Sequence, residues 1–180
     1  MDDTRNAFDD LPGDLMMWIL IVSELLVFGA GLIAYLSVRV TDPAGFAEAQ
    51  ASLHRAEAGM NTLVLVTSGW LAALATRAGT LALTRLYLGA AAALGVVFLF
   101  VKGMEYADKA AHGVTFETDP FFTFYYLLTG FHAAHVLAGI VILGLVAIQC
   151  QRRTVEAGTA FWHMVDLVWV ILFPILYLLG

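Results

Sequence analysis

Five ionisable side chains lie inside long apolar stretches of this sequence, and they are the residues that could do chemistry: Glu24, His132, His135, His163 and Asp166. A charged group at the centre of a bilayer costs about 2.5 to 3.5 kcal/mol on insertion scales, so such groups pair with one another or serve a function. The two members of each His-x-x-His and His-x-x-Asp pair are three residues apart, which places them on one side of a helix. We therefore expect function to depend on this polar set.

The depth of these residues restricts their possible partners. Glu24 follows about nine residues of the first apolar stretch, which places it about 14 Å into the membrane at 1.5 Å per residue. His132 and His135 fall near the same level when counted from the opposite end of the fourth stretch, so Glu24 could meet them. Asp166 could pair with His163 or with a neighbouring helix. The sequence leaves open which of these pairs form.

Three interpretations of the polar set compete. The first is an interhelical hydrogen-bond network, the usual role of polar residues in a membrane bundle; its predicted members are His132, His135, His163, Asp166, Glu105 and Asn61. The second is a proton or ligand pathway, with Glu24 as the exchanging group. The third is a metal site, since two histidines with carboxylates suit iron or zinc, although the paired Glu-x-x-His motifs of di-iron bundles are absent. The network is the favoured interpretation.

Composition identifies the elements that must position these side chains. The chain is 61% hydrophobic and only 13% charged, whereas soluble domains are about 45–50% apolar and about 25% charged. A membrane-spanning helix needs about 20 apolar residues. Five stretches meet that length: Leu15–Val38, Met60–Thr76, Arg85–Met104, Phe121–Ile148 and Phe161–Leu179. We therefore predict an all-α polytopic membrane protein, a five-helix transmembrane bundle forming one domain over residues 1–180.

Charge and cysteine content exclude several classes of function. The net charge is −6, and five acids precede the first predicted span: Asp2, Asp3, Asp9, Asp10 and Asp14. This acidic segment argues against a nucleic-acid partner, a cleaved signal peptide and a transit peptide. The single Cys150 excludes an intrachain disulfide and a cysteine-based metal cluster. No phosphate loop, nucleophile elbow or dinucleotide motif appears, so no soluble substrate of its own is expected.

The connections predict the orientation. Cytoplasmic loops carry an excess of Lys and Arg. The side of the membrane that holds the N-terminus has Arg5, Arg77, Arg85, Arg152 and Arg153. The opposite side has Arg39, Arg55, Lys102 and Lys109. The first set lies in shorter connections, which favours a cytoplasmic N-terminus in a bacterial plasma membrane. Residues 44–58 are either a short surface helix or a solvated connector.

Aromatic residues and one proline near the predicted span ends suggest two further features. Trp18, Trp70, Trp162, Trp169, Tyr125, Tyr126 and Tyr177 fit interfacial belts. Pro174 predicts a local kink in the last helix or a tolerated break near the outer surface.

Four short motifs follow one another along the chain: Met17-Trp18 with Ser23-Glu24-Leu25, Glu105-Tyr106, Thr129-Gly130-Phe131-His132 with His135-Val136, and Trp162-His163 with Val165-Asp166 and Val168-Trp169. In this order they resemble the cytochrome c oxidase subunit III family. The full-length family has seven spans, so two N-terminal helices are missing here. Leu11-Pro12-Gly13-Asp14 and the ending Phe173–Gly180 are more similar to the short five-helix relatives found with bacterial nitric oxide reductase.

The resemblance implies an accessory subunit without haem, copper or another cofactor. Such a subunit packs against a haem-bearing catalytic membrane subunit among membrane lipids, supports proton uptake and protects against turnover inactivation. Glu24 matches the family's intramembrane glutamate, while structural hydrogen bonds are expected at His132, His135, His163 and Asp166. The preferred partner is a nitric oxide reductase and the alternative is a bacterial cytochrome c oxidase. Rival classes are a stand-alone proton-coupled transporter or channel and a metal-dependent membrane enzyme.

Overall fold

A computed structural model describes residues 15–179. The acidic segment, Arg5 and the Leu11–Asp14 motif lie outside these residues, as does Gly180. The described part is helical and contains no strand. Its elements are α1 (Leu15–Arg39), α2 (Pro43–Ala51), α3 (Arg55–Arg77), α4 (Leu81–Ala111), α5 (Pro120–Gln149), α6 (Arg152–Phe173) and the π-helical turn η1 (Pro174–Leu178).

The five predicted spans are confirmed as helices long and apolar enough to cross a membrane. Two helix boundaries differ most from the prediction, the start of α6 and the end of α4. α6 begins at Arg152 rather than Phe161, because Val155 and Gly158 in its polar-looking first turns are buried against the bundle. α4 continues to Ala111 instead of ending at Met104, so Glu105 lies within the helix rather than after it.

Local capping explains where several helices begin. Asp42 accepts a hydrogen bond from the third residue after it, and Asp119 does the same, at 3.1 and 2.9 Å. Each is followed by a proline, Pro43 or Pro120, whose missing N–H costs nothing in a first helical turn. Thr80 caps α4 in the same way at 3.3 Å. α2 therefore confirms a short helix in the first connector, although it ends at Ala51 and residues 55–58 belong to α3.

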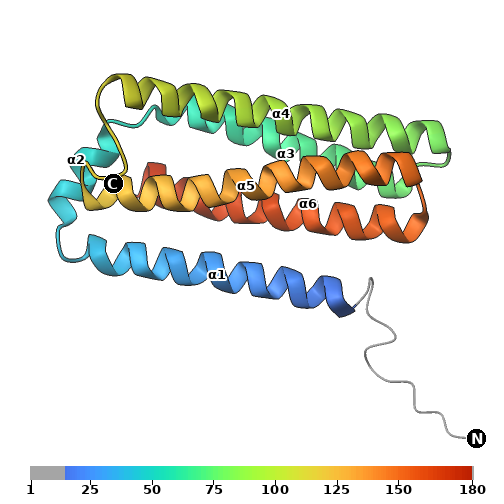
Figure 1. The fold of residues 1–180 in the computed structure, drawn as a ribbon, viewed down its shortest axis with the longest axis horizontal. Coiled ribbons are helices and arrows are strands. Elements are labelled where there is room, and N and C mark those ends of the chain that lie inside the picture. The colour runs from blue at the N-terminus through green and yellow to red at the C-terminus, as the bar shows by residue number, and fades with distance from the viewer. Residues whose placement is uncertain (1–14, 180) are drawn as a thin grey trace, which may run out of the picture.

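The four helices α3 to α6 form a bundle, and α1 lies beside it along α5 and α6 (Figure 1). Only Phe28, Leu32 and Tyr35 of α1 are buried. The start of α1 and the α3–α4 and α5–α6 connections share one end of the molecule. α2, the α4–α5 connection and the C-terminus share the other, which we call the α2 end (Figure 1).

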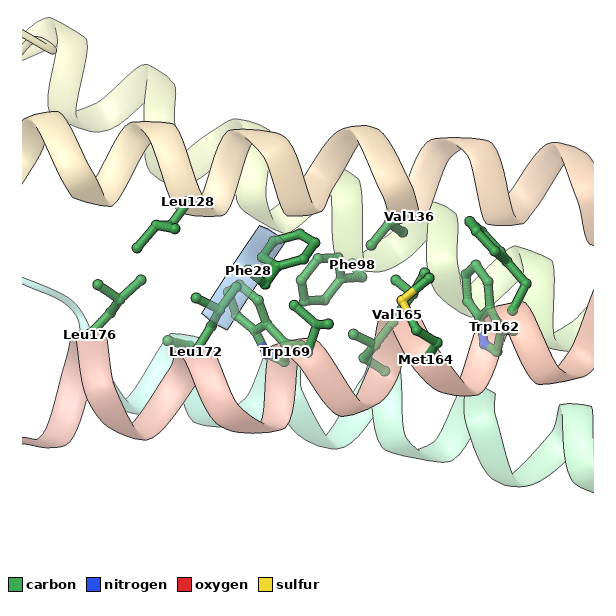
Figure 2. Close-up of a cluster of buried hydrophobic side chains, with 14 of the residues drawn as sticks. Phe28, Phe98, Leu128, Val136, Trp162, Met164, Val165, Trp169, Leu172 and Leu176 are labelled. Carbon is green, nitrogen blue, oxygen red and sulfur yellow. The ribbon is translucent and has the colours of Figure 1, made fainter. Parts of the chain in front are cut away.

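The bundle centre is filled by aromatic side chains that were predicted to sit at membrane interfaces. Trp162, Trp169, Tyr125 and Tyr177 are at most 1% exposed, so the interface prediction is wrong for these four (Figure 2 shows the two tryptophans). They tolerate burial because each polar tip finds a partner, as described below. Trp70, by contrast, is 62% exposed on α3.

Two glycines make room for Trp162. A Cβ atom on Gly95 would lie 2.6 Å from its ring, and one on Gly139 would lie 2.5 Å from it. α4 and α5 each approach the indole at a position where only hydrogen fits. This explains why so large a side chain is fully enclosed between three helices.

Pro174 interrupts the last helix by widening it. The chain continues as a π-helical turn closed by the N–H of Leu179, which donates to the Pro174 carbonyl at 2.9 Å. Gln50 of α2 donates its amide to the Leu176 carbonyl at 2.9 Å. The predicted break is therefore present, and α2 ties the widened turn to the bundle.

Candidate functional site

Glu24 of α1 and His135 of α5 meet between their helices. Oε2 of Glu24 lies 3.0 Å from Nε2 of His135, and the two side chains are 23% and 15% exposed. The contact has the distance of an ion pair, although its angle is not that of a hydrogen bond. Glu24 thus meets one of the two histidines that its depth allowed.

A proton on one of the two groups is what would make this contact attractive. His135 Nδ1 lies 2.8 Å from the carbonyl oxygen of Phe131, and a carbonyl only accepts, so Nδ1 carries hydrogen. Nε2 is then the nitrogen that faces Glu24. A neutral Nε2 lone pair and a carboxylate would repel at 3.0 Å, so attraction requires one further proton, either on His135 or on Glu24. In either form the pair is neutral as a whole.

Two aromatic rings pack on the histidine of this pair. The His135 ring centroid lies 4.5 Å from that of Phe131 and 5.5 Å from that of Phe28. These rings shield the imidazole from water on their side, which strengthens its attraction to the carboxylate. The pair is therefore suited to hold a proton between α1 and α5.

His163 and Asp166 form a looser pair on α6. Nδ1 of His163 and Oδ2 of Asp166 are 3.9 Å apart, with side chains 44% and 12% exposed. Oδ2 packs directly on α3, where a Cβ at Gly69 would stand 2.0 Å from it. Oδ1 has no hydrogen-bond partner within residues 15–179. The hydrogen bonds expected for Asp166 are not formed by the described residues.

His132 is fully buried, and the hydrogen bonds expected for it are also absent. Neither ring nitrogen has a partner in the described part of the chain. Its ring stacks on Trp169 with centroids 5.0 Å apart and meets the edge of Phe98 at 5.8 Å. Aromatic side chains from α4 and α6 occupy the space around its ring.

Asn61 joins α3 to α4. Its Nδ2 donates to the Phe98 carbonyl of α4 at 3.2 Å. Sequence reasoning missed two comparable links from α6 to α3. Trp162 Nε1 donates to Ser68 Oγ at 3.0 Å, and Trp169 Nε1 donates to Thr62 Oγ1 at 3.0 Å.

Glu105 belongs to a buried cluster whose cation was not predicted. Lys102 Nζ donates to Glu105 Oε2 at 2.8 Å, and the two side chains are 3% and 9% exposed. Tyr125 and Tyr177 donate to Glu105 Oε1 at 2.8 and 2.9 Å, and Lys102 also donates to both phenol oxygens. Rings surround the ammonium, with centroids 4.9 to 5.5 Å away: Tyr106, Tyr125, Trp169 and Tyr177.

Lys102 had been counted among the positive charges of a connection, and that assignment was wrong. The predicted span ended at Met104, so a lysine near its end passed for a loop residue. The available signal was the Lys-x-x-Glu spacing, which places both side chains on one helix face.

A metal centre finds no support in this arrangement. Within residues 15–179, no three side chains of His, Cys, Asp or Glu gather closely enough to hold a metal ion. The candidate site is therefore the Glu24–His135 pair, with the Lys102–Glu105 cluster as a separate buried charge pair nearer the α2 end.

Comparison with known families agrees with the resemblance carried by the four motifs. The family model described as "Cytochrome c oxidase subunit III" matches residues 12–180. The chain belongs to the cytochrome c oxidase subunit III family. A protein of Synechocystis named cytochrome c oxidase subunit 3 is 33% identical, with 92% of this chain and 76% of that protein covered. A probable cytochrome c oxidase subunit 3 of Mycobacterium tuberculosis is 30% identical, with 90% and 84% covered.

A third relative joins two subunits in one chain. A protein of Aeropyrum pernix named heme-copper oxidase subunit I+III is 26% identical over 98% of this chain, which matches 25% of that protein. Membership of the subunit III family makes this chain an accessory subunit of the haem-copper oxidases. It also implies a catalytic subunit I as its partner.

Proposed function

We propose that this chain is a cofactor-free subunit that stabilises a haem-bearing catalytic subunit and assists its proton uptake in a bacterial respiratory chain. Family membership supports the accessory role. The Glu24–His135 contact supports the proton role and is the observation that carries it. A carboxylate and an imidazole that share one proton can exchange it without leaving a lone charge in the membrane.

The preferred catalytic partner is an oxygen-reducing oxidase. The relatives from Synechocystis and Mycobacterium tuberculosis, both named as oxidase subunits, favour it. A nitric oxide reductase stays a second candidate, because the Leu11–Asp14 motif and the Phe173–Gly180 ending are similar to its short relatives. The proposed placement is the bacterial plasma membrane with a cytoplasmic N-terminus, surrounded by lipid.

Co-purification in gentle detergent tests the partner. The chain, isolated from its native membrane, is examined by haem absorbance and mass spectrometry. We expect a haem-bearing subunit I of the oxygen-reducing type. A nitric oxide reductase subunit would select the second candidate, and a stable haem-free preparation with proton or solute flux in vesicles would favour a transporter instead.

The proton role is tested by Glu24→Gln in the assembled complex. An amide keeps the shape of the side chain but cannot exchange a proton, so we expect normal assembly with slower proton-coupled turnover and faster inactivation. Glu48→Gln on α2 is the matched control, because Glu48 is exposed at the α2 end. Identical turnover and inactivation for Glu24→Gln and wild type would reduce Glu24 to a packing residue.

A further inference from the structure

Two buried tyrosines share one carboxylate near the α2 end of the bundle. Tyr125 of α5 and Tyr177 of η1 are fully buried, and each donates its hydroxyl hydrogen to Oε1 of Glu105, at 2.8 and 2.9 Å. Lys102 donates to Oε2 of that carboxylate at 2.8 Å, so the cluster is neutral as a whole. A phenol that already donates to a base can lose an electron and pass its proton along that hydrogen bond. Oxidation then yields a neutral phenoxyl radical instead of a radical cation.

Two neighbouring tyrosines lack such a base. Tyr126 donates to the carbonyl oxygen of Val114 at 2.9 Å, and the hydroxyl of Tyr106 lies 2.6 Å from that of Thr129. Carbonyl and hydroxyl oxygens accept a hydrogen bond but do not take up a proton near neutral pH. An electron removed from either ring would therefore leave a charged radical cation. An oxidised state is more stable on a tyrosine that faces a carboxylate.

Trp169 is also disfavoured as the oxidised group. Its Nε1 donates to the hydroxyl of Thr62 at 3.0 Å, which is no base, and the ammonium nitrogen of Lys102 lies 5.3 Å from the centre of its ring. A radical cation on this indole would face a second positive charge in a buried setting, where like charges repel strongly. The two tyrosines that contact Glu105 are therefore the places in this cluster where the loss of one electron is easiest.

A row of aromatic rings leads from the buried tyrosines to the protein surface. Tyr126 is partly exposed, and its ring centroid lies 5.2 Å from that of Tyr125. The ring of Tyr177 follows at 6.2 Å from Tyr125. Electrons move readily between rings this close, so an oxidant at the surface needs to contact only Tyr126. The ammonium of Lys102 lies 4.9 and 5.1 Å from the ring centres of the two buried tyrosines, whose faces attract a cation.

We propose that this cluster stores one oxidising equivalent taken from a peroxyl radical at the membrane surface. The peroxyl radical gains an electron from Tyr126 and a proton from the aqueous phase, and a hydroperoxide is formed. Tyr126 regains its electron from Tyr125, and the hydroxyl proton of Tyr125 moves to Glu105. The products are a hydroperoxide, a neutral phenoxyl radical on Tyr125 and a protonated Glu105, while the charge of Lys102 is unchanged. This activity does not depend on the proton role proposed for Glu24.

Electron paramagnetic resonance of the purified full chain in detergent tests the proposal. Peroxyl radicals are generated by warming a water-soluble azo initiator in air, and samples are frozen at intervals. We expect a tyrosyl signal, and we expect it to narrow when the protein carries ring-deuterated tyrosine. The absence of a protein signal, or a signal that ring deuteration of tyrosine leaves unchanged, would overturn the proposal.

Variants locate the radical. Tyr125→Phe/Tyr177→Phe keeps both rings and removes only the two hydroxyls, and we expect it to lower the tyrosyl signal severalfold. Tyr87→Phe alters a partly exposed tyrosine of α4 outside the cluster, so it is the matched control and should keep the signal. A wild-type signal in Tyr125→Phe/Tyr177→Phe would place the radical elsewhere and overturn the proposal.

The part of Glu105 as proton acceptor is tested by Lys102→Met/Glu105→Gln, which removes the base while the cluster stays neutral and both tyrosines remain. We expect the radical yield to fall severalfold, because the phenol proton has no acceptor. Lys109→Met removes another buried lysine of α4 and should behave like wild type. A wild-type yield in Lys102→Met/Glu105→Gln would overturn the proton step. Thermal midpoints identify a variant that has unfolded, and the tyrosine variants, which keep the ion pair, then decide.

Discussion

Replacing Lys102 by methionine removes one half of a buried ion pair while keeping most of the side-chain volume. Lys102 and Glu105 are 3% and 9% exposed, so the remaining carboxylate would stay enclosed with only the hydroxyls of Tyr125 and Tyr177 as donors. Breaking a buried pair in this way costs about 3 to 5 kcal/mol. The double variant Lys102→Met/Glu105→Gln removes both charges. It should lose only hydrogen bonds that average about 0.6 kcal/mol each in membrane bundles, and therefore about 1 to 2 kcal/mol in total.

Unfolding in mixed micelles by increasing SDS, followed by tryptophan fluorescence, measures these free energies. Lys109→Met is the control, because Lys109 is also buried on α4 but lies over the Phe122 ring and forms no ion pair among residues 15–179. We expect the control to cost about 2 kcal/mol, the value of a desolvated cation–π contact, and so less than the broken ion pair. The reasoning would be refuted if the loss of unfolding free energy in the double variant equalled the sum of the losses in Lys102→Met and Glu105→Gln.

Three further predictions concern contacts between other helices. His135→Leu should weaken the packing of α1 by about 1 kcal/mol, because Glu24 loses its counter-charge. Adding Glu24→Gln should restore the packing. SDS unfolding of both variants measures the difference. Gly69→Ala should cost about 1 to 3 kcal/mol by overpacking, since its Cβ would meet the Asp166 carboxylate at 2.0 Å. Adding Asp166→Ala should relieve that cost. Equal thermal midpoints for Gly69→Ala and Gly69→Ala/Asp166→Ala would contradict this. Trp162→Phe should cost at least about 1 kcal/mol, through a lost hydrogen bond and a smaller ring, and thermal unfolding in detergent should show the loss.

The spans could be predicted because membrane insertion selects for apolar length, which is a property of the sequence alone. Helix ends and burial depend on neighbours instead. The start of α6 at Arg152 follows from packing of Val155 and Gly158, and hydropathy does not report that. Trp162 and Trp169 fit an interfacial belt by sequence position, yet glycines and hydroxyls on other helices allow their burial.

The polar set was predictable in membership but only partly in pairing. Depth allowed Glu24 to meet His135, and the two side chains do meet, each near the middle of its helix. Depth could not show that His132 would be enclosed by rings, since that requires knowing which residues of α4 and α6 face it. Lys102 was missed because its role depends on where α4 ends, and helix ends are the least certain feature of a sequence pattern.

The fit of Trp162 between Gly95 and Gly139 constrains the order in which these positions can change during evolution. Neither glycine can acquire even a methyl group while the indole is present, because the added carbon would overlap it. A smaller residue at position 162 must therefore come first, and it would leave a cavity that later substitutions at the glycines could fill. Intermediates in the reverse order pass through an overpacked bundle, so substitutions at these three positions should be strongly epistatic.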